Sequence, residues 1–155
     1  MGKKKAPPAM SPAFAAADDD DLELMRQTLS AEGAPKVVAQ RNKDGWTPLH
    51  QAAFAGSVEV VQLLIDSGAD VASKCSDGDT PCHYASAQGH LEVIKRLLKK
   101  GGVRLFALSD NDGESVLDVA QNPKFKRALE ALEQQATNDE EDEIEEVDFD
   151  DEENS

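Results

Sequence analysis

The sequence predicts an all-α protein in which similar helix–turn–helix units stack into a solenoid. The stretch beginning at Asp44 returns 33 residues later at Asp77, and a fixed period of this length is typical of stacked-repeat proteins. Most recurring residues are turn, cap and spacing residues, which indicates a repeated structural unit and not a repeated catalytic site. The second helix of each unit is apolar around most of its circumference, so it needs neighbours on several sides.

The first helix of a unit is predicted from its boundary residues. Asp44–Gly45 is a turn signal, Thr47 can cap a helix, and Pro48 suits the first helical position because its missing N–H is not needed there. Gly56 then ends the helix. The same pattern recurs at Asp77–Gly78, Thr80–Pro81 and Gly89.

The second helix is predicted over residues 58–66 and again over 91–99. In the first copy, Glu59, Gln62 and Asp66 form one narrow polar stripe, and every other position is apolar. Such a helix is expected to be covered by neighbouring units on both flanks. Val60, Leu64, Val93 and Leu97 are therefore predicted to be buried.

These motifs resemble the ankyrin repeat: TPLHQAA with GSVEVVQLLIDSGADV in the first unit, and TPCHYAS with GHLEVIKRLLKKGG in the second. The resemblance covers roughly Phe14 to Gln135, and the layout is similar to small eukaryotic ankyrin proteins with an acidic C-terminal tail. It implies an ankyrin-repeat solenoid of antiparallel helix pairs joined by β-hairpin-like fingers, with a concave face that binds proteins. It also implies that His50 and His83, at the TPLH position, bridge neighbouring fingers through their imidazoles.

The domain boundaries follow from the repeat and from the charge. Residues 1–12 are expected to be a disordered basic arm, and 13–136 the repeat domain, with an N-terminal cap over 13–43, repeats over 44–76 and 77–109, and a C-terminal cap over 110–136. Residues 137–155 are expected to be a disordered acidic tail. Residues 139–155 hold 12 of the 31 acidic residues and no base, which leaves 19 acids against 16 bases and a net charge of −3 elsewhere.

The last unit departs from the period. Its Asp112–Gly113 follows Asp77–Gly78 by 35 residues, and Ser115 replaces the capping threonine. Asn122–Pro123 predicts the start of a closing helix that runs through about Gln135. Between the units, Val103 to Asn111 is apolar at Leu105, Phe106 and Leu108. This segment either tucks under the last unit or forms a loop that contacts a partner.

Catalytic and metal chemistry find little support in the sequence. Cys82 and His83 could suggest a zinc ligand pair or a nucleophile, but Cys82 aligns with the core position of Leu49. With Cys75 as the only other cysteine, a disulfide framework is not expected and a reducing compartment fits better. We therefore expect no enzyme activity, no cofactor and no metal. With neither a signal peptide nor a transmembrane run recognised, the expected location is the cytoplasm, the nucleus or both.

We predict the binding surface from the positions of each unit that are not needed for helix caps, turns or packing. Trp46 and Phe54 place large rings where packing does not require them, and aromatic residues dominate binding hot spots. Acids surround them along the fingers. The alternative is that Trp46 lies flat on its own finger and the acids only serve the turns. The predicted partner-binding residues are Lys43, Asp44, Trp46, Phe54, Ser76, Asp77, Asp79, Tyr84, Gln88, Asp112 and Glu114.

The acidic fingers and tail favour a protein partner with a basic segment and an aliphatic or aromatic anchor. We expect an adaptor or escort that is monomeric alone, with no membrane and no direct nucleic-acid binding, because phosphate backbones repel acidic surfaces. Two alternatives remain open. The chain could be a plain ankyrin scaffold whose tail only gives solubility, or an acidic chromatin or transcription regulator that uses Lys3–Lys5 for nuclear import.

Overall fold

A computed structural model of the chain describes the backbone of residues 11–154 and the side chains of residues 11–139. Every regular element in this part of the chain is helical, which confirms the predicted all-α class. The elements are α1 (Pro12–Asp19), α2 (Leu22–Glu32), α3 (Ala34–Val38), α4 (Pro48–Ala55), α5 (Val58–Asp66), α6 (Pro81–Gln88), α7 (Leu91–Gly101), the 3-10 helix η1 (Val103–Ala107) and α8 (Pro123–Asn154).

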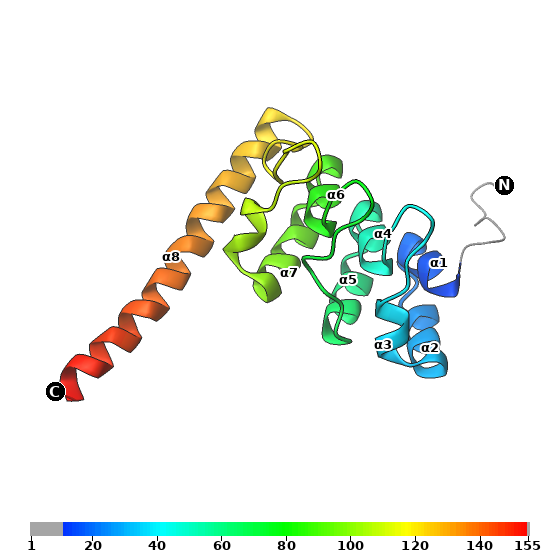
Figure 1. Cartoon of the computed structure of the whole chain (residues 1–155), viewed down its shortest axis with the longest axis horizontal. Coiled ribbons are helices and arrows are strands. Elements are labelled where there is room, and N and C mark those ends of the chain that lie inside the picture. Colours follow the sequence, from blue (N-terminus) through cyan, green and yellow to red (C-terminus); the bar gives the residue numbers. More distant parts are fainter. Residues whose placement is uncertain (1–10, 155) are drawn as a thin grey trace.

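The helices form two layers in one curved row (Figure 1). The inner layer is α1, α4 and α6, and each packs against the next. The outer layer is α2, α5 and α7, which also pack in order. Each outer helix lies against the inner helix of its own unit. The chain is therefore the stacked solenoid that the repeat predicts.

The inner helices begin at the predicted caps. The Thr47 hydroxyl accepts a hydrogen bond from the backbone N–H of His50, and the His50 ring accepts one from the backbone N–H of Thr47. Thr80 and His83 repeat this capping box in α6. The other ring nitrogen, Nε2, lies 3.0 Å from the Asp79 carbonyl oxygen for His50 and 2.9 Å from the Glu114 carbonyl oxygen for His83. Each imidazole therefore joins a cap to the next finger, as the resemblance implies.

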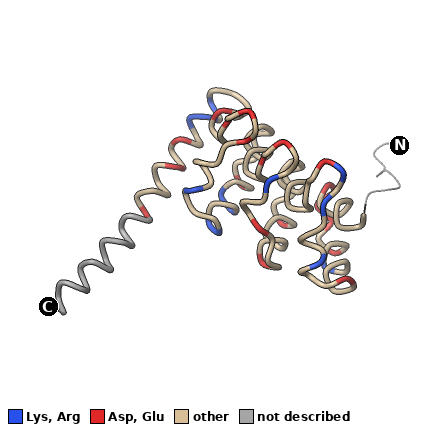
Figure 2. Tube along the Cα trace, in the orientation of Figure 1, with Lys and Arg blue, Asp and Glu red and all other residues tan. Residues whose placement is uncertain are grey.

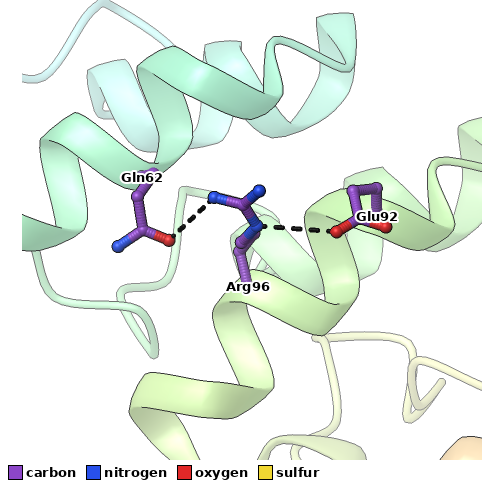
Figure 3. A network of polar contacts seen from close by, with 3 residues as sticks. All are labelled: Gln62, Glu92 and Arg96. Atoms are coloured by element: carbon purple, nitrogen blue, oxygen red, sulfur yellow. Dashed lines mark hydrogen bonds and ion pairs between the residues drawn. The ribbon is translucent and has the colours of Figure 1, made fainter.

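The outer helices are buried as predicted. Val60, Leu64, Val93 and Leu97 are each 0% exposed. On the polar side of this layer, Arg96 of α7 contacts Glu92 at 3.5 Å and donates to the Gln62 side chain of α5 at 3.2 Å (Figure 3). Burial of the apolar side supplies most of the cohesion between units, because surface ion pairs contribute little.

The two ends of the stack modify the unit in different ways. At the N-terminal end, Asp20 adopts a left-handed conformation and the Asp21 side chain caps α2. At the C-terminal end, Leu105 and Phe106 of η1 are buried in the common core, so the apolar segment after α7 packs inward. Ser115 and Asp118 do cap each other, but residues 116–119 form turns and not the expected helix.

Helix α8 begins at Pro123 as predicted, but it is longer than expected. It continues to Asn154, whereas the sequence analysis predicted disorder over 137–155. No glycine or proline follows Pro123, so the sequence contains no helix-ending residue there, and glutamate is a good helix former. The predicted basic arm covers residues 1–12; residues 1–10 lie outside the described residues, and α1 already begins at Pro12. None of the helices described is long and apolar enough to cross a membrane.

The buried imidazoles predict acid-sensitive folding. Burial is the main cause that lowers the pKa of His50 from 6.5 to about 4, and the charge of Arg41 makes a smaller contribution. Between about pH 6.5 and 4, the unfolded chain therefore binds a proton at His50 that the native state does not bind. The free energy of unfolding is lost as pH falls through this range. For this one group the loss should reach roughly 2 kcal/mol at about pH 5. Chemical unfolding at pH 7 and pH 5 measures it.

The variants His50→Gln and His90→Gln separate this contribution from the rest. His50→Gln should be less stable at both pH values but should lose less on acidification than the parent protein. His90→Gln, at the start of α7, should keep the parent's sensitivity. Equal losses in all three proteins would show that His50 does not carry the effect.

Gly56 predicts a second stability effect, at the contact between units. Its φ is +80°, and a Cβ atom there would lie 2.6 Å from the His90 ring, which hydrogen-bonds to the Phe54 carbonyl oxygen at 3.1 Å. Gly68 also has a positive φ, +101°, but a Cβ atom added there would meet no neighbour within 4 Å. Gly68→Ala should cost about 1 kcal/mol for backbone strain alone. Gly56→Ala should cost about 1 kcal/mol more, because His90 must leave its acceptor. Equal unfolding free energies for the two variants would contradict this account.

Candidate functional site

Three fingers project from one edge of the stack, at residues 42–46, 75–79 and 110–114. Each is closed by a backbone hydrogen bond between its first and last residues. In the first finger the Asn42 carboxamide oxygen accepts from the backbone of Asp44 and Trp46, at 2.9 and 3.0 Å. In the third, the Asp110 carboxylate accepts from Asp112 and Glu114 in the same way, at 2.9 and 2.8 Å. The tips are therefore held by tight turns, and no strand is assigned in the described chain.

Neighbouring fingers are also joined to one another. The backbone N–H of Ser76 donates to the Asp44 carbonyl oxygen at 3.1 Å, and that of Asn111 donates to the Asp77 carbonyl oxygen at 2.9 Å. The Arg41 guanidinium donates to the carbonyl oxygens of Gly45 and Lys74, both at 2.8 Å. These bonds fix the spacing between side chains on adjacent fingers.

An aromatic patch, formed by Trp46, Phe54 and Tyr84, lies where the first finger meets helices α4 and α6. The Trp46 ring centroid lies 4.5 Å from that of Tyr84 and 5.5 Å from that of Phe54. Phe54 is 38% exposed and is the only exposed large hydrophobic residue in the described part of the chain, while the other two rings are half-buried. Trp46 therefore packs against the inner helices of two units, and does not lie only on its own finger.

The three rings occupy positions where the repeat itself has no aromatic residue. A shift of 33 residues aligns Trp46 with Asp79, Phe54 with Ala87, and Tyr84 with Gln51. The unit folds with a small or polar residue at each of these positions. Stacking of the units therefore does not require the patch.

Acidic residues of the second and third fingers lie beside the patch and form an acidic row: Asp77, Asp79, Asp110, Asp112 and Glu114. Figure 2 shows acidic positions along the finger edge of the stack. Ligand-type atoms of Asp77 and Asp79 lie within 4.8 Å of each other, as do those of Asp79 and Asp110, and those of Asp110, Asp112 and Glu114. The row is therefore continuous across two fingers.

Asp79 is the member of the acidic row whose pKa is raised. Partial burial, followed by the hydrogen bond and charge of the neighbouring Asp110 carboxyl, raises the pKa of Asp79 to about 6. Hydrogen bonding from the Glu114 backbone is the main effect that lowers the pKa of Asp110. Below about pH 6 the Asp79 carboxyl is therefore protonated and shares its proton with the Asp110 carboxylate.

Tyr84 connects the aromatic patch to the acidic row. Its hydroxyl lies 3.2 Å from the Cys75 sulfur, and its interaction with the Asp79 carboxyl lowers the pKa of that group. Burial, and then the bond to Cys75, raises the pKa of Tyr84, so the phenol stays neutral. One end of the Tyr84 ring thus faces apolar surface and the other faces carboxyl groups.

The structure brings some of the predicted site residues together and separates others. It gathers the three aromatic residues with Asp77, Asp79, Asp112 and Glu114. Lys43, Asp44 and Ser76 are exposed at the finger tips. Gln88 lies at the far end of α6, where its carbonyl oxygen accepts from the Gln121 side chain at 3.2 Å.

Asp110 and Cys75 also belong to this site, although neither was predicted from the sequence. Asn42, Cys75 and Asp110 begin the three fingers and are equivalent in the structure. Aligning Gly78 with Gly113 across the longer interval of 35 residues already places Asp110 opposite Cys75. That alignment marks these residues as turn positions, but it carries no signal that Asp110 lies beside Asp79.

The geometry offers no prepared nucleophile or free metal ligand at Cys82 and His83. Burial raises the pKa of the Cys82 thiol to about 12, so the reactive thiolate is suppressed. The two ring nitrogens of His83 already bond to the Thr80 backbone and to the Glu114 carbonyl oxygen, although the ring lies near Asp79 and Asp110. These residues act as packing and hydrogen-bonding groups.

Comparisons with known proteins agree with this architecture. The family model described as ankyrin repeats (many copies) matches residues 13–65, 50–98 and 82–121. A stretch of 56 residues, 36% of this chain, is 43% identical to a segment that makes up 23% of ankyrin repeat domain-containing protein 49 of Homo sapiens. Another stretch, of 55 residues and 36% of this chain, is 40% identical to 7% of the 2-5A-dependent ribonuclease of Homo sapiens. A third, of 43 residues and 28% of this chain, is 54% identical to 9% of the probable E3 ubiquitin-protein ligase XBOS32 of Oryza sativa subsp. japonica.

The chain thus matches less than a quarter of the length of each of these relatives. The activities that some of their names state belong to whole proteins, of which the matched segments are a small part. The family model spans the stack from α1 through the turns after the third finger. With its capped inner helices, buried outer helices and bridged fingers, the chain belongs to the ankyrin-repeat family.

Proposed function

We propose that the chain is a non-catalytic protein-binding module, an adaptor or escort that holds a positively charged segment of a client protein on its finger face. The finger face consists of the aromatic patch, the acidic row and the exposed tips at Lys43, Asp44 and Ser76. Ankyrin repeats in general mediate interactions between proteins, and that general role supports the proposal.

The observation that carries the proposal is the position of the aromatic patch beside the acidic row. Packing does not require these rings, yet they contact each other across two units. Exposed aromatic side chains with an acidic border match a partner that offers apolar surface and positive charge. In the described chain, the one ion pair formed joins Glu92 and Arg96 on the outer layer, so none neutralises the row.

The acidic tail is proposed to assist this binding. Residues 139–155 carry 12 acids and no base, and such a segment raises the rate at which a basic client arrives. Its contribution should weaken in salt, because exposed charges are screened over about 10 Å at 0.1 M ionic strength.

The test is selection from a random peptide library, followed by titration of the enriched peptides. We expect the enriched peptides to carry net positive charge and to bind less tightly as salt is raised from about 50 to about 500 mM. Trp46→Ala combined with Phe54→Ala should weaken binding about tenfold, the usual cost of removing a hot-spot residue. Leu63→Ala, a truncation on the outer helix α5, is the matched control and should bind like the parent protein.

Removal of residues 139–155 tests the tail separately. We expect slower association at low salt and little change at high salt, measured by stopped-flow mixing with an enriched peptide. Unchanged association rates would favour the plain scaffold, in which the tail only gives solubility. Enrichment of neutral or acidic peptides would overturn the proposed client chemistry altogether.

A further inference from the structure

The junction between the aromatic patch and the acidic row combines two features that recognise different parts of a side chain. One is the set of ring faces of Trp46, Phe54 and Tyr84. The other is the carboxyl pair Asp79–Asp110, which the Tyr84 hydroxyl joins to the patch. An occupant must therefore present a flat or apolar surface to the rings and positive charge to the carboxyls.

We infer that this junction is an arginine-binding subsite, in which one arginine of the client stacks on the aromatic patch and pairs with the Asp79–Asp110 carboxyls. The inference rests on the proposed function, because it names the anchor that a basic client would use. It also replaces the aliphatic or aromatic anchor expected from the sequence, since the rings of the patch border carboxyl groups rather than a closed apolar pocket.

Charge complementarity favours a cation at this place. Two described cations beside the fingers bond to main-chain oxygens: the Arg41 guanidinium donates to finger carbonyl oxygens, and the Lys74 ammonium donates to the Ser109 carbonyl oxygen at 3.3 Å. Burial, and then the hydrogen bond and charge of Asp110, raises the pKa of Asp79 to about 6, so below that pH the two carboxyls share a proton. A cation from a partner would replace that proton.

Ring and carboxyl geometry favours arginine over lysine. A guanidinium group is planar, so it can stack on a ring and at the same time present a fork of N–H donors to carboxylates. An ammonium group is a compact, strongly hydrated charge and cannot do both. Tyr84 is held for this purpose by Cys75 at one end and by the Trp46 ring on its face.

At or below about pH 6, where Asp79 is protonated, binding should release the shared proton. With the arginine already positive, Asp79 passes from the carboxylic acid to the carboxylate, and its proton goes to the buffer. Burial, then Asp110 and to a smaller extent Asp77, raise the proton affinity of Asp79, while Tyr84 lowers it. Burial lowers the pKa of His50 and of His83, so these rings add less charge as pH falls.

Three short glycine–serine peptides test the inference, with two arginines, two lysines or two citrullines at the same positions. Trp46 is the only tryptophan of the chain, so its fluorescence and its indole N–H resonance report binding at the patch directly. We expect the arginine peptide to bind about tenfold more tightly than the citrulline peptide and several-fold more tightly than the lysine peptide at low salt.

The variants Asp79→Asn and Asp110→Asn should each reduce the preference for arginine over citrulline. Glu130→Gln, which removes one exposed acid from α8, is the matched control and should leave the preference unchanged. Affinity of the parent protein should rise as pH increases through about 6, and calorimetry at about pH 5.5 in buffers of different ionisation heat should show proton release. Asp79→Asn should abolish both effects.

The outcomes separate this inference from the proposed function. If lysine or citrulline peptides bind as tightly as the arginine peptide, the inference of an arginine subsite is wrong. If peptides from the library still require Trp46 and Phe54 for binding, the protein-binding proposal nevertheless holds. If calcium ions bind the parent protein and displace the arginine peptide, the carboxyls form a metal site and the inference is overturned. If no basic peptide binds and the library selects none, both fail.

Discussion

Two buried imidazoles determine how this molecule holds together. His50 and His83 each accept a hydrogen bond from a helix cap through one ring nitrogen and reach the carbonyl oxygen of the next finger through the other. This arrangement requires the neutral Nε2–H tautomer, because the cap N–H occupies Nδ1. A single side chain thus starts its own helix and sets the distance to the following unit. Finger geometry, and with it the whole candidate site, depends on these bonds.

The apolar packing and the hydrogen bonds act at different levels. Side chains such as Val60, Leu64 and Leu97 make up the continuous core, and their burial favours any compact stack of these helices. Hydrophobic contacts alone do not fix the exact register between units. The directional bonds of the histidines, together with Ser57 to the Ala17 carbonyl oxygen and Ser86 to the Val116 carbonyl oxygen, select one register. Function needs that register, because the aromatic patch is assembled from two units.

Much of the fold could be predicted from the sequence, because residues with the same structural role recur at aligned positions of the two repeats. Thr47 and Thr80 as caps, Cys82 as a core residue and the covered outer helices all follow from aligned positions. Predictions were weakest where the repeat ends. Ser115 precedes turns and not a helix, and α8 extends past the expected end at Gln135. No neighbouring copy of the unit packs on these residues to constrain them.

The candidate site shows the same limit in another form. Trp46, Phe54 and Tyr84 could be singled out because they depart from the repeat, but their mutual contact could not. It depends on how far one unit is displaced from the next, which no single unit encodes. The role of Asp110 could not be predicted either, because the aligned positions of the other fingers hold Asn42 and Cys75 and no second acid. Its coupling to Asp79 is a tertiary effect between fingers that are far apart in the sequence.

The cross-unit bonds from His50, Ser57, His83, Ser86 and His90 all end on main-chain oxygen atoms. Main-chain atoms are common to every amino acid, so the accepting residue can change its side chain without breaking the joint. Asp79 and Glu114 are acceptors of this kind, and both also face the outside. Substitutions at these positions can therefore change which partner the outer surface binds, while the hydrogen bonds between units are kept. The fold and the binding specificity can then evolve independently.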